Sequence, residues 1–280
     1  MDLAGKMALP RNPSMWIVLV VVSTGVVWLA LHLLLHSSAI RQPFAVAHRA
    51  GAGLAPENTQ AAVREALVRG DEYIEVDVQR TSDGVLVVFH DDSVQRLSTG
   101  QGLIRELTWE QTKVLEVGSH FSPDYAGEKI PTLERILELT ARSNVGLYLE
   151  AKSPGKYPGM DQDIANILEK HQASDDVVVL SFDDEWVNAY RKTASGSRVG
   201  LISWWRGSMP SSAEAAVVDV FWAAVILDPT LIRRAHNRGV QVGVWTVNSP
   251  RLMRLMLLLG VDGVTTDYPN RWNMVRESKK

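Results

Sequence analysis

The stretch from Tyr73 to Asp92, YIEVDVQRTSDGVLVVFHDD, contains the strand around which the fold of this chain can be predicted. In its first half, apolar residues alternate with Glu75, Asp77 and Gln79, and this period of two predicts a β-strand. Carboxylates at positions i and i+2 of a strand point to the same face, about 6.7 Å apart along the backbone. Glu75 and Asp77 can therefore converge on one cation, although a half-exposed strand with a solvated polar face would show the same pattern.

The second half of the stretch predicts a hairpin. Asp83-Gly84 is a residue pair that tight turns between antiparallel strands prefer, because glycine adopts a positive φ without strain. The apolar run from Val85 to Phe89 is the returning arm, and it delivers His90 at its end. The interpretation as a metal site then depends on whether further acids and histidines lie at the ends of the other predicted strands.

The composition limits what the chain can be. Its 280 residues are enough for one barrel-sized core or two smaller ones. A formal net charge of -3 and a pI near 6.2 argue against a protein built mainly to bind nucleic acid. The absence of cysteine excludes disulfides, thiolate catalysis and cysteine zinc sites.

Residues 15–35, MWIVLVVVSTGVVWLALHLLL, contain no Asp, Glu, Lys or Arg and are long enough to cross about 30 Å of hydrocarbon as a helix. A cleaved signal peptide is the alternative, since small residues follow at 37–39, but its apolar region is normally only about 7–15 residues long. We therefore expect a single-pass membrane protein with a retained anchor. Because Lys6 and Arg11 precede the span and Arg41 follows it, the positive-inside rule predicts a cytoplasmic N-terminus and an extracytoplasmic main domain.

This anchor sets the expected domain organisation. A short linker leaves no room for a flexible stalk, so the main domain should lie close to the bilayer. The oligomeric state is not predicted by the sequence. The expected parts are an N-terminal cytoplasmic tail (1–14), a transmembrane helix (15–35), a linker (36–43), a barrel domain (44–275) and a C-terminal tail (276–280).

From residue 44 onward, short apolar runs alternate with helical stretches, which is typical of parallel βα units. Eight such strands predict an α/β fold, a closed TIM (β/α)8 barrel, with a small hairpin-plus-helix insertion whose helix lies around Thr108–Glu116. The segment Ser211–Val220 is at most a short helix in this scheme. The expected strands are Phe44–His48, Tyr73–Gln79, Val145–Lys152, Val177–Phe182, Arg198–Ile202, Phe221–Ile226, Val240–Val247 and Val261–Thr266. The expected helices are Thr59–Arg69, Thr132–Arg142, Asp161–His171, Asp184–Lys192, Pro229–Asn237 and Pro250–Leu259, with Thr59 and Thr132 as N-caps.

Acidic residues gather at the predicted strand ends, where the βα loops of a barrel build the functional face. Glu75, Asp77 and Glu150 would repel one another in a cavity of low dielectric constant. A hard divalent cation bound by oxygen ligands removes that cost, so these three acids are the predicted metal ligands. In the alternative, each carboxylate is neutralised separately by a cation such as Arg49 or Lys152.

Two histidines accompany the acids. His48 ends the first strand and begins HRAGAGLAPENT, and His90 ends the hairpin. Two imidazoles near one metal can divide the general base and general acid roles at neutral pH. Arg49 and Lys152 supply the positive charge that suits a phosphate.

These residues resemble the glycerophosphodiester phosphodiesterase family. The likeness runs from Phe44 to Pro269, and one departure is Ala50, where the family usually has glycine. The motifs that carry it are His48-Arg49 through Pro56-Glu57-Asn58-Thr59, Glu75-Val76-Asp77, the hairpin ending in His90-Asp91, Leu149-Glu150-Ala151-Lys152, Val244-Trp245-Thr246-Val247-Asn248 and Thr266-Asp267-Tyr268-Pro269.

The resemblance implies a TIM-barrel hydrolase that uses one divalent metal ion, Ca²⁺ or Mg²⁺, to cleave a phosphodiester. In related members a neighbouring substrate hydroxyl attacks phosphorus, and water then opens the cyclic phosphate. The resemblance also implies that the Trp245 ring forms a wall of the substrate site; the alternative is that this ring packs in the core. The other roles it implies are metal binding by Glu75, Asp77 and Glu150, acid–base catalysis by His48 and His90, and phosphate binding by Arg49 and Lys152.

The expected substrates are glycerophosphodiesters or lysophospholipids. The short tether and the pair Trp204-Trp205 favour a lipid at the bilayer surface, as in a lysophospholipase D, because tryptophan prefers the membrane interface. Ser181 is expected to be structural or substrate-facing, since no Gly-x-Ser-x-Gly context surrounds it. The alternatives are a non-catalytic membrane-bound binding barrel and a different metal-dependent barrel hydrolase.

Overall fold

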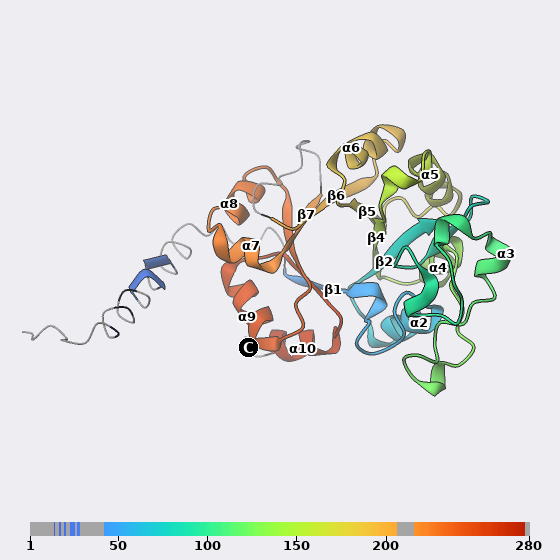
Figure 1. The fold of residues 1–280 in the computed structure, drawn as a ribbon. Coiled ribbons are helices and arrows are strands. Elements are labelled where there is room, and N and C mark those ends of the chain that lie inside the picture. The colour runs from blue at the N-terminus through green and yellow to red at the C-terminus, as the bar shows by residue number, and fades with distance from the viewer. Residues whose placement is uncertain are drawn as a thin grey trace, which may run out of the picture.

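Eight parallel strands closed into a barrel form the centre of the computed structural model, which describes residues 42–205 and 216–277 and isolated positions between 14 and 28 (Figure 1). The ring closes because β1 pairs with β2 as well as with β9. This confirms the predicted TIM barrel. The strands are β1 (Phe44–Ala47), β2 (Tyr73–Arg80), β4 (Gly146–Ala151), β5 (Val177–Ser181), β6 (Arg198–Ser203), β7 (Val217–Phe221), β8 (Gln241–Trp245) and β9 (Gly263–Thr266).

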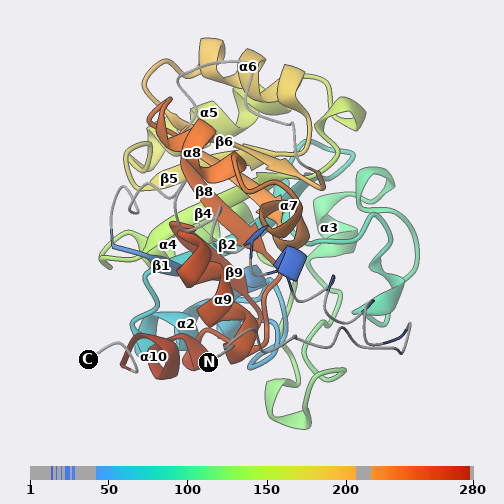
Figure 2. The same ribbon diagram turned by 90° about the vertical axis from the view of Figure 1, so that its left-hand side faces the viewer.

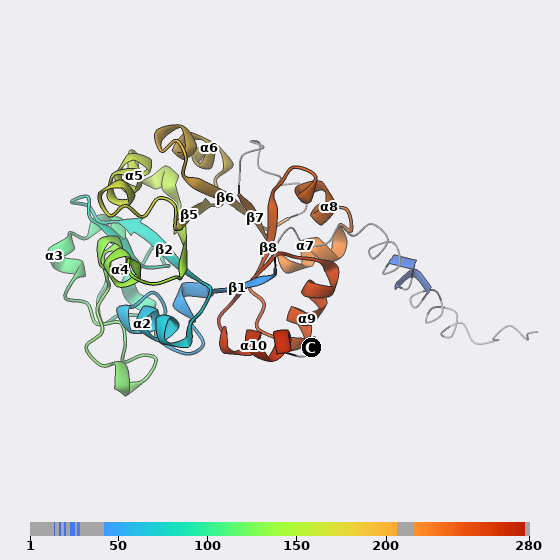
Figure 3. The same ribbon diagram turned by 180° about the vertical axis from the view of Figure 1, so that it is seen from behind.

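Helices surround this ring on its outside, as the views from the front and from behind show (Figures 1 and 3). The Thr59 side chain accepts a hydrogen bond from the Ala62 N–H at the start of α2, and Thr132 accepts one from the Arg135 N–H at the start of α4. Both predicted N-caps are therefore confirmed. The main helices are α2 (Gln60–Arg69), α4 (Leu133–Thr140), α5 (Met160–Lys170), α6 (Asp184–Thr193), α7 (Trp222–Leu227), α8 (Leu231–His236), α9 (Pro250–Leu259) and α10 (Asn270–Glu277).

Side chains fill the barrel interior toward the amino-terminal ends of the strands. Ring centroids lie 4.8 Å apart for Phe44 and Tyr73, and 5.2 Å apart for Tyr73 and Tyr148. Val178 and Val217 pack in the same buried cluster. Because alternate residues of a strand share a face, Glu75 and Asp77 follow Tyr73 on the inner face of β2 and lie nearer the carboxyl ends of the strands.

An insertion follows β2. Strand β3 (Leu86–Val88) returns antiparallel to β2, and α3 (Trp109–Thr112) lies in the segment before α4, to one side of the barrel in Figure 2. This confirms the hairpin-plus-helix insertion, although the helix is a single turn and shorter than expected. The insertion has a small apolar core of its own, formed by Val87, Phe89, Val94, Leu97, Ile104, Val117 and Ile130.

The predicted sixth strand, Phe221–Ile226, is wrong. The strand is Val217–Phe221, and Trp222–Leu227 forms helix α7. The apolar residues continue without interruption from the strand into the helix, so periodicity alone does not mark the boundary. Helix α10 is a further element that the sequence did not predict.

The predicted transmembrane helix, residues 15–35, and both predicted tails lie largely outside the described residues. Within the part of the chain that the structure describes, no helix has the length and apolar character needed to cross a bilayer.

Candidate active site

A cavity of about 330 Å³ opens where the strands end, and the structure brings all eight predicted site residues to it. Seven of them line the cavity, and Asp77 lies beside them against Glu150, its partner in register. The lining residues with titratable side chains, here called the charged wall, include His48, Arg49, Glu75, His90, Glu150 and Lys152. The lining residues with aromatic rings, here called the aromatic wall, are Phe182, Trp204 and Trp245.

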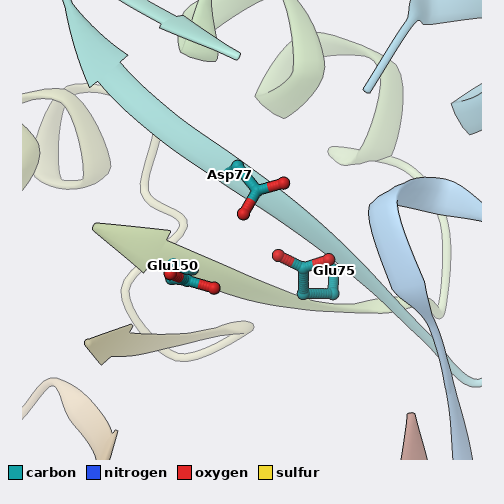
Figure 4. Close-up of side chains that lie close together, drawn as sticks. All are labelled: Glu75, Asp77 and Glu150. Carbon is teal, nitrogen blue, oxygen red and sulfur yellow. The ribbon is translucent and has the colours of Figure 1, made fainter. Parts of the chain in front are cut away.

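Glu75 and Asp77 on β2 and Glu150 on β4 form an acid cluster (Figure 4). Each offers one carboxylate oxygen within 4.8 Å of the others, and the three residues are only 5, 1 and 9% exposed. Glu75 Oε1 and Asp77 Oδ1 are buried and have no hydrogen-bond partner among the described residues. Such buried acceptors are unfavourable unless something satisfies them, and a hard divalent cation would do so. The acid cluster therefore fits a divalent metal ion.

The pKa values of the cluster show that burying three carboxylates together is unfavourable when all of them are ionised. Burial raises the pKa of Glu75 well above its usual value, and the charges of Asp77 and Glu150 raise it further. Burial and Asp77 also raise the pKa of Glu150 to about 7. Burial opposes ionisation of Asp77 too, but Lys152 and His90 outweigh it and lower the pKa of that carboxyl.

Two cations contact the cluster. Lys152 Nζ lies 2.7 Å from Glu150 Oε1 and 3.5 Å from Asp77 Oδ1. Arg49 donates its backbone N–H to Glu75 Oε2 at 2.7 Å, and its Nε lies 3.5 Å from Asp77 Oδ2. Separate neutralisation, the alternative considered from the sequence, thus accounts for part of the cluster but leaves Glu75 Oε1 without a hydrogen-bond partner in the described part of the chain.

The loop that carries Arg49 has an unusual backbone. Arg49 and Ala50 have φ angles of 50° and 65°, in the left-handed region, and Gly51 continues with 95°. Ala50 is fully buried. The chain therefore makes this turn with alanine at the position where the family usually has glycine.

Each histidine is held by a carboxylate. His48 Nδ1 lies 2.7 Å from Asp267 Oδ1, and His90 Nδ1 lies 2.6 Å from Asp91 Oδ1. A ring that donates through Nδ1 leaves Nε2 available for proton transfer. Burial lowers the pKa of His90, and the charges of Lys152 and Arg49 lower it further against the pull of Asp77.

Sequence reasoning assigned no role to the residues that hold these groups. Asp91 and Asp267 lie in the motifs quoted above and could have been found as the carboxylates adjoining His90 and ending the last strand. Asn58, also in a motif, donates its side-chain amide to Asp77 Oδ2 at 2.8 Å. Asp219 lines the cavity, and no motif marks it.

The aromatic wall packs ring against ring. Ring centroids lie 4.6 Å apart for Trp204 and Trp245, and 5.6 Å apart for Phe182 and Trp245. Phe221 packs behind Trp245 at 5.8 Å. Trp245 therefore both lines the cavity and packs in the cluster. Ser181, by contrast, is buried and donates to the Ala151 carbonyl, which is a structural contact.

This end of the barrel combines two cations, two imidazoles held by carboxylates, and three buried acids that suit a divalent cation. The chain is on these grounds a phosphoric diester hydrolase. The sequence model of the Glycerophosphoryl diester phosphodiesterase family matches residues 48–271, so the chain belongs to that divalent-metal-dependent family.

Known proteins resemble it over most of its length. A glycerophosphodiester phosphodiesterase of Caldanaerobacter subterraneus subsp. tengcongensis is 34% identical over 240 residues, which cover 83% of this chain and 97% of that protein. One of Bacillus altitudinis is 32% identical over 250 residues, covering 84% and 98%. The structure of an Oleispira antarctica phosphodiesterase in complex with the product sn-glycerol-3-phosphate matches with a TM-score of 0.78 at 27% identity, covering 84% and 97%.

Proposed function

We propose that this protein hydrolyses glycerophosphodiesters to glycerol phosphate and an alcohol, using one divalent cation, Ca²⁺ or Mg²⁺, bound by Glu75, Asp77 and Glu150. The acid cluster carries this proposal, because its buried oxygens have too few partners within the described chain. Family membership and the curated relatives support the reaction, and the Oleispira antarctica structure contains a glycerol phosphate product.

Arg49 and Lys152 hold the phosphate in this proposal. Both cations line the cavity beside the acid cluster, where their charge attracts phosphate oxygens. The bound cation would neutralise negative charge that develops on the phosphoryl oxygens.

The two histidines move the protons. A hydroxyl of the glycerol next to the phosphate forms the new P–O bond while the bond from phosphorus to the leaving alcohol breaks. One imidazole accepts the proton of the attacking hydroxyl, and the other donates a proton to the alcohol oxygen. Water then opens the cyclic phosphate with the roles reversed, which restores both rings. The lowered pKa of His90 favours its neutral form, which is the form that can accept a proton.

A second candidate is a lysophospholipase D, which releases lysophosphatidic acid from lysophospholipids. An exposed aromatic ring at the cavity favours it, since Trp204 lines the cavity and is 62% exposed, and its neighbour in sequence, Trp205, is 53% exposed. Aromatic rings of this kind are favoured at a membrane interface. This second proposal includes a membrane anchor. Residues 15–35 would span the bilayer once, and the barrel would lie on the extracytoplasmic side.

The test is turnover of a panel of phosphodiesters in the presence of chelator, with Ca²⁺, Mg²⁺ or Mn²⁺ added back. We expect chelator to abolish turnover and one of the cations to restore it. A protein that cleaves no phosphodiester under any of these conditions would contradict the proposal and support a binding barrel. Exclusive use of glycerophosphocholine over lysophosphatidylcholine would exclude the second candidate.

A further inference from the structure

A buried acid at the floor of the cavity has no role in the reaction described above. Asp219 lies on β7 between Val217, which packs in the barrel interior, and Phe221, which packs behind the aromatic wall. Its side chain faces the same cavity as the charged wall and is only 5% exposed. The floor of the cavity thus places the Asp219 carboxyl and the Thr265 hydroxyl among apolar side chains such as Leu180 and Ile202.

The Asp219 carboxyl is held in place on one side only. The Thr265 hydroxyl donates to Oδ2 at 3.2 Å. Gly243 leaves room for Oδ1, since a Cβ at that position would lie 2.6 Å from this oxygen. The Trp245 indole N–H donates to the Asp219 backbone carbonyl at 3.1 Å, which ties the floor to the aromatic wall. Oδ1 itself has no hydrogen-bond partner among the described residues.

The chemistry of this carboxyl suits a neutral hydroxyl. Burial raises the pKa of Asp219 to about 7, with the Thr265 hydrogen bond opposing and the charge of Glu150 adding to the rise. A carboxyl that is partly protonated at neutral pH can either donate to or accept from a hydroxyl. A hydroxyl buried in a closed floor loses its water, so it needs such a partner.

The size of the cavity decides which end of a phosphodiester reaches the floor. The mouth is open beside Trp204, and the floor is closed by the packed barrel interior. The larger and more variable alcohol therefore extends to the mouth, and the compact glycerol enters the floor. The glycerol hydroxyl next to the phosphate is engaged in the attack on phosphorus, which leaves the terminal hydroxyl to be bound.

We propose that Asp219 is a specificity-determining residue that binds the terminal hydroxyl of the glycerol moiety through Oδ1. This inference rests on the proposed phosphodiesterase function. Acylation at that oxygen removes the hydroxyl hydrogen and places a long chain in the closed floor. Asp219 therefore selects glycerophosphodiesters over lysophospholipids, in favour of the first of the two candidate activities.

The experiment compares kcat/KM for glycerophosphocholine with that for an analogue in which propane-1,2-diol replaces glycerol. The analogue keeps the attacking hydroxyl and lacks only the terminal one. We expect the wild-type protein to prefer the glycerol compound by about 10- to 100-fold, the cost of leaving one buried polar group unpaired. In Asp219→Ala, kcat/KM should fall by that factor for glycerophosphocholine and change little for the analogue. The ratio of the two kcat/KM values should therefore approach one.

Two further variants make the result decisive. Asp219→Asn keeps the shape and a hydrogen-bonding group, and it should retain part of the preference even where Asp219→Ala does not fold. Asp175→Ala is the matched control, because this exposed carboxylate precedes β5 at the opposite end of the barrel. A wild-type ratio near one, or an unchanged ratio in Asp219→Ala, would overturn the inference while leaving the phosphodiesterase function intact. Absence of turnover on both compounds would instead refute the function on which it rests.

Discussion

The two walls of the cavity differ in how their side chains are held. Each member of the charged wall is tied by directional contacts, such as Lys152 to Glu150 at 2.7 Å and His48 to Asp267 at 2.7 Å. The aromatic wall is held by ring packing, and Trp204 remains 62% exposed. Buried charges require hydrogen-bonded partners, which fixes their geometry, whereas an exposed ring keeps apolar surface free for contact with a ligand. The charged wall is therefore suited to a fixed reaction, and the aromatic wall to adapting to different alcohols.

The largest effect should come from removing the metal site. Glu75→Gln removes one charge from the acid cluster, and we expect kcat/KM to fall by about 10³-fold or more because charge stabilisation at the phosphoryl group is lost. Turnover with and without added cation measures this, with Asp175→Asn as the control. Full activity in Glu75→Gln would mean that the charged wall does not bind the metal.

The next effect concerns the proton-transfer groups. His90→Gln should lower kcat by about 10²- to 10⁴-fold with little change in KM, since a general acid or base is lost while phosphate binding remains. Steady-state kinetics on glycerophosphocholine separate the two constants. A fall in kcat of less than tenfold would assign the proton transfer to another group.

Stability against pH tests the electrostatics of the charged wall without turnover. The pKa of Glu150 is raised to about 7 in the folded protein, so the folded state keeps a proton that the unfolded state has lost. Metal-free protein should therefore lose stability as pH rises from about 4.5 to about 7. Glu150→Gln removes this loss and should be more stable than wild type by about 1–3 kcal/mol at pH 8, with a smaller difference at pH 5.

Chemical denaturation at the two pH values measures that difference. Added Ca²⁺ or Mg²⁺ should reverse it, because the cation stabilises only the charged wild-type cluster. A stability difference that is independent of both pH and added metal would show that the pKa of Glu150 is not raised in the folded protein.

The smallest effect should come from the aromatic wall. Trp204→Ala removes one exposed ring, and a loss of about 0.5–1 kcal/mol would raise KM about two- to fivefold for an alcohol that packs on the ring. Choline is the alcohol of glycerophosphocholine, so KM should rise for this substrate and not for the glycerophosphodiester of a small alcohol such as methanol. Equal effects on both substrates would remove the proposed division between the two walls.

The sequence predicted the charged wall better than the aromatic one. Alternation within Tyr73–Arg80 places Glu75 and Asp77 on one face, because strand geometry is local. Which strands are neighbours follows from the regular order of a barrel, and this placed Glu150 beside them. The neighbourhood of Phe182, Trp204 and Trp245 depends instead on rotamers and packing across several strands.

Asp219 shows why one part of the site could not be predicted. The sequence around it was assigned to a possible short helix, since the next strand was expected at Phe221–Ile226. Because the strand was predicted too late in the sequence, Asp219 was not assigned to the barrel. Its inward direction follows only from the register of β7 with its neighbours, in which Asp219 pairs with Ile202 and Gly243.

The left-handed turn at Arg49 and Ala50 has a consequence for engineering this protein. A non-glycine residue in that region costs about 1–2 kcal/mol, and the turn persists because it aims the Arg49 amide at Glu75. Glycine at position 50 would adopt this φ without strain and should therefore increase thermal stability without altering any reacting group. Because the Ala50 methyl group is fully buried, the surroundings have no space for a larger side chain. Position 50 of this turn therefore tolerates a smaller residue and not a larger one.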